Sequence, residues 1–219
     1  MGPSCKMINE IVFKHNIPCV IAAGNSGPAP GTIGSPGSAA GAITVGSVSA
    51  IVNEGKVSNF SSTGPVSNFM IKPDILGYGG EVVPNVSKEL IYSAVAGEFA
   101  EKNSVQYAGL AGTSMATPGI AGCMVLLKEY GYSFDRPDFE DKLTQLGMKN
   151  HTLKNIKEGW GAFNISEIIR IVDKPESPII PILQSLSSAR GSLYAPLTLK
   201  QLSYKDNPTY RVVRLPVVS

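Results

Sequence analysis

The stretch Cys19-Val-Ile-Ala-Ala-Gly-Asn25 decides the fold of this 219-residue chain. Five consecutive apolar residues, 19–23, predict a short strand that is buried on both faces, because a strand with one wet face would alternate apolar and polar residues. The strand pattern stops at Gly24, and a Gly/Pro/Ser-rich loop over 24–41 follows it. A loop of this length inside a compact domain generally has a functional reason.

Helical and strand patterns alternate around this stretch. Before it, residues 4–15 carry apolar side chains at helical spacing, and this pattern ends ahead of Pro18. After it, residues 49–112 read mostly as short strands and turns. We expect strands over 42–48 and 73–76. We expect helices over 114–130, 136–147 and 164–172. This alternation predicts an α/β fold in which a mostly parallel sheet is flanked by helices.

Composition divides the chain into two parts. Residues 174–219 hold six of the 16 prolines and a single glycine, and they carry six basic and two acidic side chains. Residues 1–173 have the opposite, slightly acidic balance. We therefore expect one folded domain over 1–173, followed by a Pro-rich, basic and irregular C-terminal tail of unknown role. A partly disordered tail is an equally good description of this composition.

Charge and cysteine usage exclude several functions. A net charge of +2 gives no electrostatic case for nucleic acid or an anionic membrane. Three cysteines without a CxxC pair and two histidines without HExxH predict no zinc site. No acidic cluster has the spacing of calcium ligands. The longest apolar run, 120–127, is too short to span a bilayer. We expect no cofactor, no metal site and no membrane span.

A second stretch, Gly112-Thr-Ser-Met-Ala-Thr-Pro118, carries the chemistry. Ser114 opens an apolar helix, where backbone N–H groups lack partners and the helix dipole favours negative charge. A serine there can offer its hydroxyl as a nucleophile and its own N–H to the oxyanion that forms. Asn25 stands at the carboxyl end of a buried strand, and its uncharged amide suits the same oxyanion. From position alone, however, Ser114 is more simply a helix cap and Asn25 a turn residue.

The two stretches together resemble the subtilisin-like serine proteases, the subtilases. Gly112 to Pro118 is similar to the motif around their nucleophile, and Ala22-Ala-Gly-Asn25 to the motif around their oxyanion-hole asparagine. Other segments resemble the family's connecting elements in the same order, namely 42–48, 58–64, 71–75 and 159–164. The resemblance covers about residues 1–172 and implies a partial subtilisin-like fold that hydrolyses peptide bonds through an acyl-enzyme.

The resemblance also assigns roles to single residues. Ser114 is the implied nucleophile, and Asn25 the implied side-chain donor of the oxyanion hole. Thr113 would support the same hole. The wall of the pocket for the substrate residue before the scissile bond is implied to consist of Ala22, Ala23 and Gly24. A polypeptide is the expected substrate. The resemblance leaves calcium binding open, although no site can be identified, and it favours an extracellular location only weakly, so the location stays unknown.

The sequence departs from the family at the catalytic base. The mechanism needs a His to accept the serine proton and an Asp to orient that His, and the family's Asp-Thr-Gly and His-Gly-Thr contexts do not occur. His15 and His151 match ordinary surface histidines. We therefore expect the C-terminal part of a catalytic domain, with the other half as its partner and little turnover alone. The alternative is a non-catalytic peptide-binding or structural remnant of a subtilase.

Overall fold

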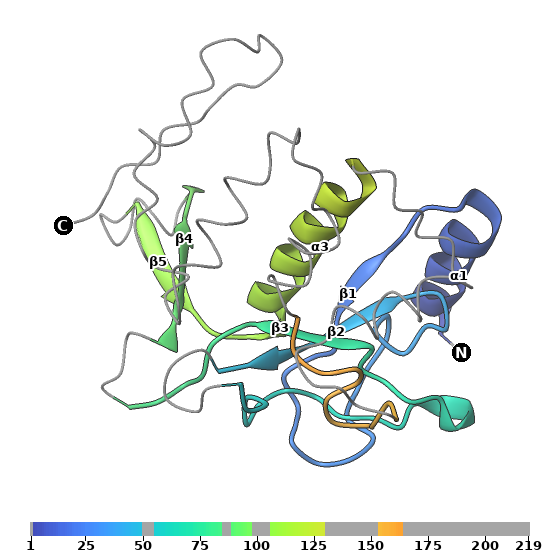
Figure 1. Ribbon diagram of the computed structural model, residues 1–219, viewed down its shortest axis with the longest axis horizontal. Helices are drawn as coiled ribbons and strands as arrows, with labels where there is room; N and C mark the ends of the chain where they lie inside the picture. The colour runs from blue at the N-terminus through green and yellow to red at the C-terminus, as the bar shows by residue number, and fades with distance from the viewer. Residues whose placement is uncertain (1, 50–54, 85–88, 98–105, 130–152, 164–219) are drawn as a thin grey trace, which may run out of the picture.

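The computed structural model describes residues 2–49, 55–84, 89–97, 106–129 and 153–163. Its elements in chain order are α1 (Pro3–His15), β1 (Val20–Ala22), β2 (Ile43–Val48), a 3₁₀ turn (Ser67–Phe69), β3 (Ile75–Tyr78), β4 (Ile91–Ala94), β5 (Tyr107–Leu110) and α3 (Thr113–Glu129) (Figure 1). The helices expected over 136–147 and 164–172, and the tail over 174–219, lie outside the described residues.

A three-stranded parallel sheet in the order β1-β2-β3 forms the centre of the molecule. Val20 and Val45 pair with Ile43 and Ile75, respectively. Every residue of β2 is buried, because this strand has a neighbour on each edge and cover on its faces. Strand β1, for which the apolar run 19–23 predicted burial on both faces, is instead half-buried, since it pairs on one edge only among the described strands. The α/β prediction is confirmed.

Helix α3 packs on this sheet and contacts all three of its strands. Its buried residues recur at helical spacing and are Thr113, Ala116, Ile120, Met124 and Leu127. The helix packs tightly at Gly77 of β3, where an added Cβ would lie 3.0 Å from the Ala116 carbonyl oxygen and 3.1 Å from Cγ1 of Ile120. Figure 1 shows α3 standing over the three strands. The small residue in β3 thus sets how closely helix and sheet approach.

Helix α1 precedes β1 and lies beside the loop that joins β1 to β2. Its Cys5 is buried with Ala39 and Ala42, and Ile21 of β1 packs against this cluster. The helix ends at His15, followed by Asn16 in the left-handed conformation with φ 53°. Neither α1 nor α3, the helices of the described residues, is long and apolar enough to cross a membrane.

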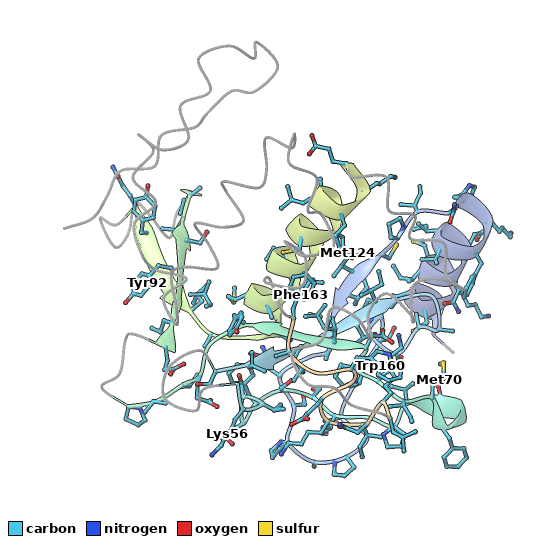
Figure 2. The ribbon with its side chains drawn as sticks, in the orientation of Figure 1. Lys56, Met70, Tyr92, Met124, Trp160 and Phe163 are labelled. Carbon is cyan, nitrogen blue, oxygen red and sulfur yellow. The ribbon has the colours of Figure 1, made fainter. Side chains whose placement is uncertain are left out.

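Strands β4 and β5 form a separate antiparallel hairpin, which the sequence did not single out among its short strands and turns. Figure 1 shows this hairpin at one end of the molecule and α1 at the other. Its side chains are mostly exposed or half-buried, and Tyr92 stands on it away from Trp160 and Phe163 (Figure 2). Strand β5 leads directly into the start of α3.

The segment 153–163 docks on the outer edge of β3. Leu76 N–H donates to Gly161 O at 3.0 Å, and Phe163 N–H donates to Leu76 O at 2.8 Å. Trp160 N–H donates to Asp74 O at 2.9 Å. Gly159 has a φ of +59°, and an added Cβ would lie only 2.4 Å from that same oxygen. The segment therefore acts as a further edge of the sheet, held close by a glycine.

The strand predicted over 73–76 begins later, at Ile75, and continues to Tyr78. The cause is the side chain of Asp74, because Thr44 N–H donates to its Oδ2 at 2.7 Å where a ladder carbonyl would otherwise accept. Asp74 N–H still donates to Thr44 O at 2.8 Å. A carboxylate thus substitutes for one rung of the ladder. The other boundaries differ from expectation by a single residue.

Candidate active site

The two sequence stretches meet at one edge of the parallel sheet. Asn25 follows the carboxyl end of β1, and Ser114 is the second residue of α3. The start of α3 is fixed beside the carboxyl end of β3, because Gly112 N–H donates to Gly79 O at 2.9 Å. Both Asn25 and Ser114 are exposed. Residues separated by almost 90 positions therefore face solvent in the same region.

Three hydrogen bonds connect Thr113 to the loop after β1. The Thr113 N–H and hydroxyl donate to Asn25 Oδ1 at 2.9 and 3.0 Å. The same hydroxyl accepts the N–H of Gly24 at 3.1 Å. Thr113 is fully buried, and its hydroxyl both donates and accepts, as a buried hydroxyl should. The carboxamide of Asn25 is thus held against the first residue of the Ser114 helix.

These contacts determine which way the Asn25 amide points. A backbone N–H can only donate, so the atom that faces Thr113 must be the amide oxygen, and Nδ2 must face away from it. Gly112 makes room for this group, because an added Cβ would lie 3.1 Å from Asn25 Nδ2. The donor end of the amide is therefore kept beside the helix start and clear of side chains from residue 112.

Among the described residues, one N–H of the first turn of α3 has no partner. Thr113 N–H goes to Asn25, and the N–H groups of Met115 and Ala116 donate to Gly112 O at 2.9 and 3.3 Å. Within the described residues, no acceptor faces the N–H of Ser114. A free N–H at a helix N-terminus is suited to bind an anion. The site thus presents an exposed hydroxyl together with backbone and carboxamide donors.

A catalytic base does not accompany these groups in the described residues. Helix α1 ends at His15 and β1 begins at Val20, so His15 lies near the amino end of β1, whereas Asn25 lies beyond its carboxyl end. The imidazole of His15 is exposed. His151 lies outside the described residues. The site can stabilise negative charge, but the described residues offer no group to accept the serine proton.

Comparison with known proteins places this chain in a family. Residues 2–164 match the family model that is described as the subtilase family. The chain belongs to this family. Pyrolysin of Pyrococcus furiosus is 27% identical over 222 residues, which cover 81% of this chain and 14% of pyrolysin.

Solved structures support the fold of this subtilase. A lanthipeptide protease superposes with a TM-score of 0.59 at 15% identity, over 78% of this chain and 55% of its own. The epidermin leader peptide processing serine protease EpiP of Staphylococcus aureus gives 0.58 at 24% identity, over 79% and 44% of the two chains. The subtilase chain therefore spans only part of the length of its relatives, about half for these two structures.

The loop that carries Asn25 is pinned along its length to the segment 58–64. Gly27 N–H donates to Phe60 O at 2.9 Å, and Thr32 N–H donates to Thr63 O at 2.9 Å. Ser62 bonds to the residues on both sides of Asn25. The sequence identified 58–64 only as a connecting element, because nothing in its composition shows which loop it would hold.

The pocket wall implied for Ala22, Ala23 and Gly24 is only partly a side-chain wall. Ala23 is 1% exposed and packs with Ile33 and Val66 in a buried cluster. Ala22 and Gly24 are half-buried, and Gly24 has a φ of +105°. Residue 23 as a whole is therefore inaccessible, and its N–H donates to Val45 O at 2.9 Å. The role of these three residues in substrate binding stays a prediction.

A buried charge network at the amino end of β3 was not predicted from the sequence. Both Lys72 and Lys154 bind the Asp74 carboxylate, the latter at 2.7 Å. Burial raises the pKa of Asp74, but the charges and hydrogen bonds of Lys72 and Lys154 outweigh it and hold that pKa below its ordinary value. Asp74 is thus ionised and fully engaged. The available signal was Lys72, which stands two positions before Asp74 among apolar residues, whereas Lys154 is 80 positions away and could not be linked to Asp74 from the sequence.

Cysteine and metal chemistry find no support in the described residues. Burial raises the pKa of the Cys123 thiol on α3 to about 11, so this thiol stays protonated. The Cys123 residue is half-buried on α3. Within the described ranges, no three His, Cys, Asp or Glu side chains group as metal ligands would.

Proposed function

We propose that this subtilase is a serine endopeptidase in which Ser114 is the nucleophile. Ser114 Oγ bonds to the peptide carbonyl carbon while a histidine accepts the hydroxyl proton. The carbonyl oxygen becomes an oxyanion that the N–H of Ser114 and Nδ2 of Asn25 bind. The C–N bond then breaks, the leaving amine takes the proton, and water hydrolyses the acyl-enzyme.

One observation carries this proposal, namely the pair of hydrogen bonds from Thr113 to Asn25 Oδ1. They bring the helix start that bears Ser114 together with the carboxamide that would bind the oxyanion. The family membership of the chain supports the reaction type. In enzymes of this kind, removal of one oxyanion donor lowers kcat by about 10²- to 10³-fold. We expect a loss of this size when Asn25 loses its amide.

We further propose that the His and Asp of the triad come from polypeptide outside residues 1–219. His15 lies at the wrong end of β1 for contact with Ser114. Asp74 cannot orient a histidine, because its carboxylate is buried and bound by two lysines and a backbone N–H. The family's two sequence contexts for these residues do not occur in the chain.

The surface beside the site offers a place for that polypeptide. Cys19 O and Ala23 N–H bond to β2, so the backbone groups of Val20 and Ala22 point to the other edge of β1, where the described residues provide no strand. The free backbone groups along an unpaired strand edge can pair with another strand. We propose that the missing half of the domain adds a strand there and positions its histidine near Ser114.

Labelling with a fluorophosphonate tests this function, because the reagent reacts with an activated serine. Residues 1–219 alone should label slowly and hydrolyse no peptide, since loss of triad members leaves only about 10³- to 10⁴-fold catalysis over water. Rapid labelling is expected after addition or fusion of the in-frame upstream segment that carries the Asp and His contexts. Ser114→Ala should abolish it.

Three outcomes would count against parts of the proposal. Rapid labelling of Ser114 in residues 1–219 alone would show that the base lies within the chain. If Ser114 stayed unlabelled after addition of a segment that carries both the Asp and the His contexts, this result would contradict the protease function. If the upstream coding sequence contained neither context, the alternative function, a non-catalytic remnant of a subtilase, would be favoured over a protease.

A further inference from the structure

We infer that Ser62 is a positioning residue for the oxyanion hole, acting on Asn25 from the far side of the loop. The inference rests on the proposed role of Asn25 and adds a residue that the subtilase motifs did not mark as functional. Ser62 lies in the buried run 61–64 and is completely inaccessible to solvent. It makes no contact with the substrate side of the site.

Ser62 holds the backbone on both sides of Asn25. Its N–H donates to Gly24 O at 2.9 Å, and its Oγ accepts the N–H of Ser26 at 3.0 Å. Gly24 also lies tightly against this hydroxyl, because an added Cβ there would be 3.1 Å from Ser62 Oγ. One buried residue thus fixes the peptide groups before and after Asn25, and with them the direction of its side chain.

Thr113 and Ser62 act on Asn25 from opposite ends. Thr113 holds the amide oxygen, and Ser62 holds the backbone from which the side chain starts. Neither contact suffices alone, because an amide tethered only at its oxygen can pivot when its backbone shifts. Displacement of a catalytic group by about 1 Å can cost 10²-fold in rate. The Ser62 hydroxyl therefore matters for the placement of Nδ2.

The neighbouring Ser61 provides a matched control. It is just as buried, and its hydroxyl also accepts one backbone N–H, that of Ser47 at 3.0 Å. Ser47 belongs to β2, so the side chain of Ser61 points to the sheet and that of Ser62 to the loop after β1. Both alanine substitutions leave one N–H without its acceptor and should cost similar stability. Only one of them loosens the loop around Asn25.

Amide hydrogen exchange in residues 1–219 tests the coupling without any activity. Thr113 N–H donates to Asn25 Oδ1 and has no contact with Ser62, so it reports on Asn25 from a distance. We expect Ser62→Ala to accelerate exchange at Thr113 at least tenfold relative to Ser61→Ala. Faster exchange at Ser26 with unchanged exchange at Thr113 would overturn the inference. If Ser62→Ala does not fold, Ser62→Cys and Ser61→Cys replace the pair, since sulfur is a weaker acceptor.

Kinetics of the complemented, active protease give a second test. Ser62→Ala should lower kcat about tenfold with little change in KM, as expected when transition-state binding is lost. In an Asn25→Ala background the same substitution should have no further effect on kcat. An equal loss in both backgrounds would refute action through Asn25. Failure of the proposed function itself would appear separately, as activity that survives Ser114→Ala.

Discussion

At the scale of single residues, Thr113 joins the two halves of the candidate site. Its hydroxyl accepts the N–H of Gly24 and donates to Asn25 Oδ1, while its N–H donates to the same oxygen. A valine of the same shape would keep the packing and lose the hydroxyl. Gly24 N–H would then have no acceptor in a partly buried position, which is costly.

We predict that Thr113→Val lowers the free energy of unfolding by about 1–3 kcal/mol, because it strands a buried donor. Thr117→Val is the control, since the Thr117 hydroxyl only adds a bond to Thr113 O within the helix. Its effect should stay within about 0.5 kcal/mol. Urea titration of both variants measures the difference, and equal losses would show that the Thr113 hydroxyl has no special role.

Only the candidate site residues that stand in local sequence motifs could be predicted. Asn25 and Ser114 were predicted from the stretches in which they stand. The contacts of Thr113 and Ser62 with the loop after β1 span 89 and 36 positions, and no local pattern encodes them. A serine that holds a loop and one that holds a strand, such as Ser62 and Ser61, look identical in the sequence.

At the scale of elements, the close packing of α3 on β3 decides where Ser114 is presented. Gly77 allows the helix backbone to approach the strand, and the opposite face of α3 carries Gly122, at which an added Cβ meets no described atom within 4 Å. The same substitution at these two glycines should therefore have opposite effects.

We predict that Gly77→Ala destabilises the fold by about 1–3 kcal/mol, because the new methyl group overpacks the interface with Ala116 and Ile120. Gly122→Ala should instead stabilise it, by up to about 1 kcal/mol, since alanine is the better helix former. Thermal unfolding of the two variants shows the sign of each change. Stabilisation by both would mean that α3 and β3 can separate freely.

The sequence predicted which segments form helices and strands, but it did not predict all of their boundaries. The sequence predicted β1 and β2 to within one residue at each boundary, but the apolar run of β1 overstated its burial, because β1 is half-buried. Strand β3 was placed too early, since Asp74 uses its side chain rather than a ladder carbonyl to bind Thr44. The β4–β5 hairpin was not singled out, because its exposed side chains do not alternate clearly.

At the scale of the whole molecule, one buried carboxylate connects distant parts of the chain. Asp74 binds Thr44 of β2, Lys72 beside it and Lys154 of the docked segment. Lys72 is 1% exposed. Removal of the Asp74 carboxylate would take a counter-charge away from a buried ammonium group, and this is far more costly than a broken surface pair.

We predict that Asp74→Asn lowers the free energy of unfolding at neutral pH by about 3–5 kcal/mol, because Lys72 and Lys154 lose their counter-charge. Glu10→Gln is the control, since the Glu10–Lys14 pair is exposed on α1 and its loss should leave the unfolding curve almost unchanged. Chemical denaturation compares the two variants. A small loss for Asp74→Asn would mean that the lysines find other partners.

The lowered pKa of Asp74 also predicts an acid transition. A carboxyl whose pKa is lower in the folded than in the unfolded state stabilises the fold above its ordinary pKa, and this contribution is lost as the pH falls through the lowered value. The wild-type chain should therefore lose stability below about pH 4. Asp74→Asn should show a flatter acid limb in pH-dependent denaturation, and an unchanged slope would assign the transition to other groups.

The docking of residues 153–163 has a practical consequence for spectroscopy. The chain holds a single tryptophan, Trp160, and this residue is bonded through its backbone to Asp74. Its indole nitrogen is shielded from water. Selective excitation of indole therefore gives the fluorescence of Trp160 alone. A red shift of this emission would report the release of residues 153–163 from β3, even if the rest of the chain stayed folded.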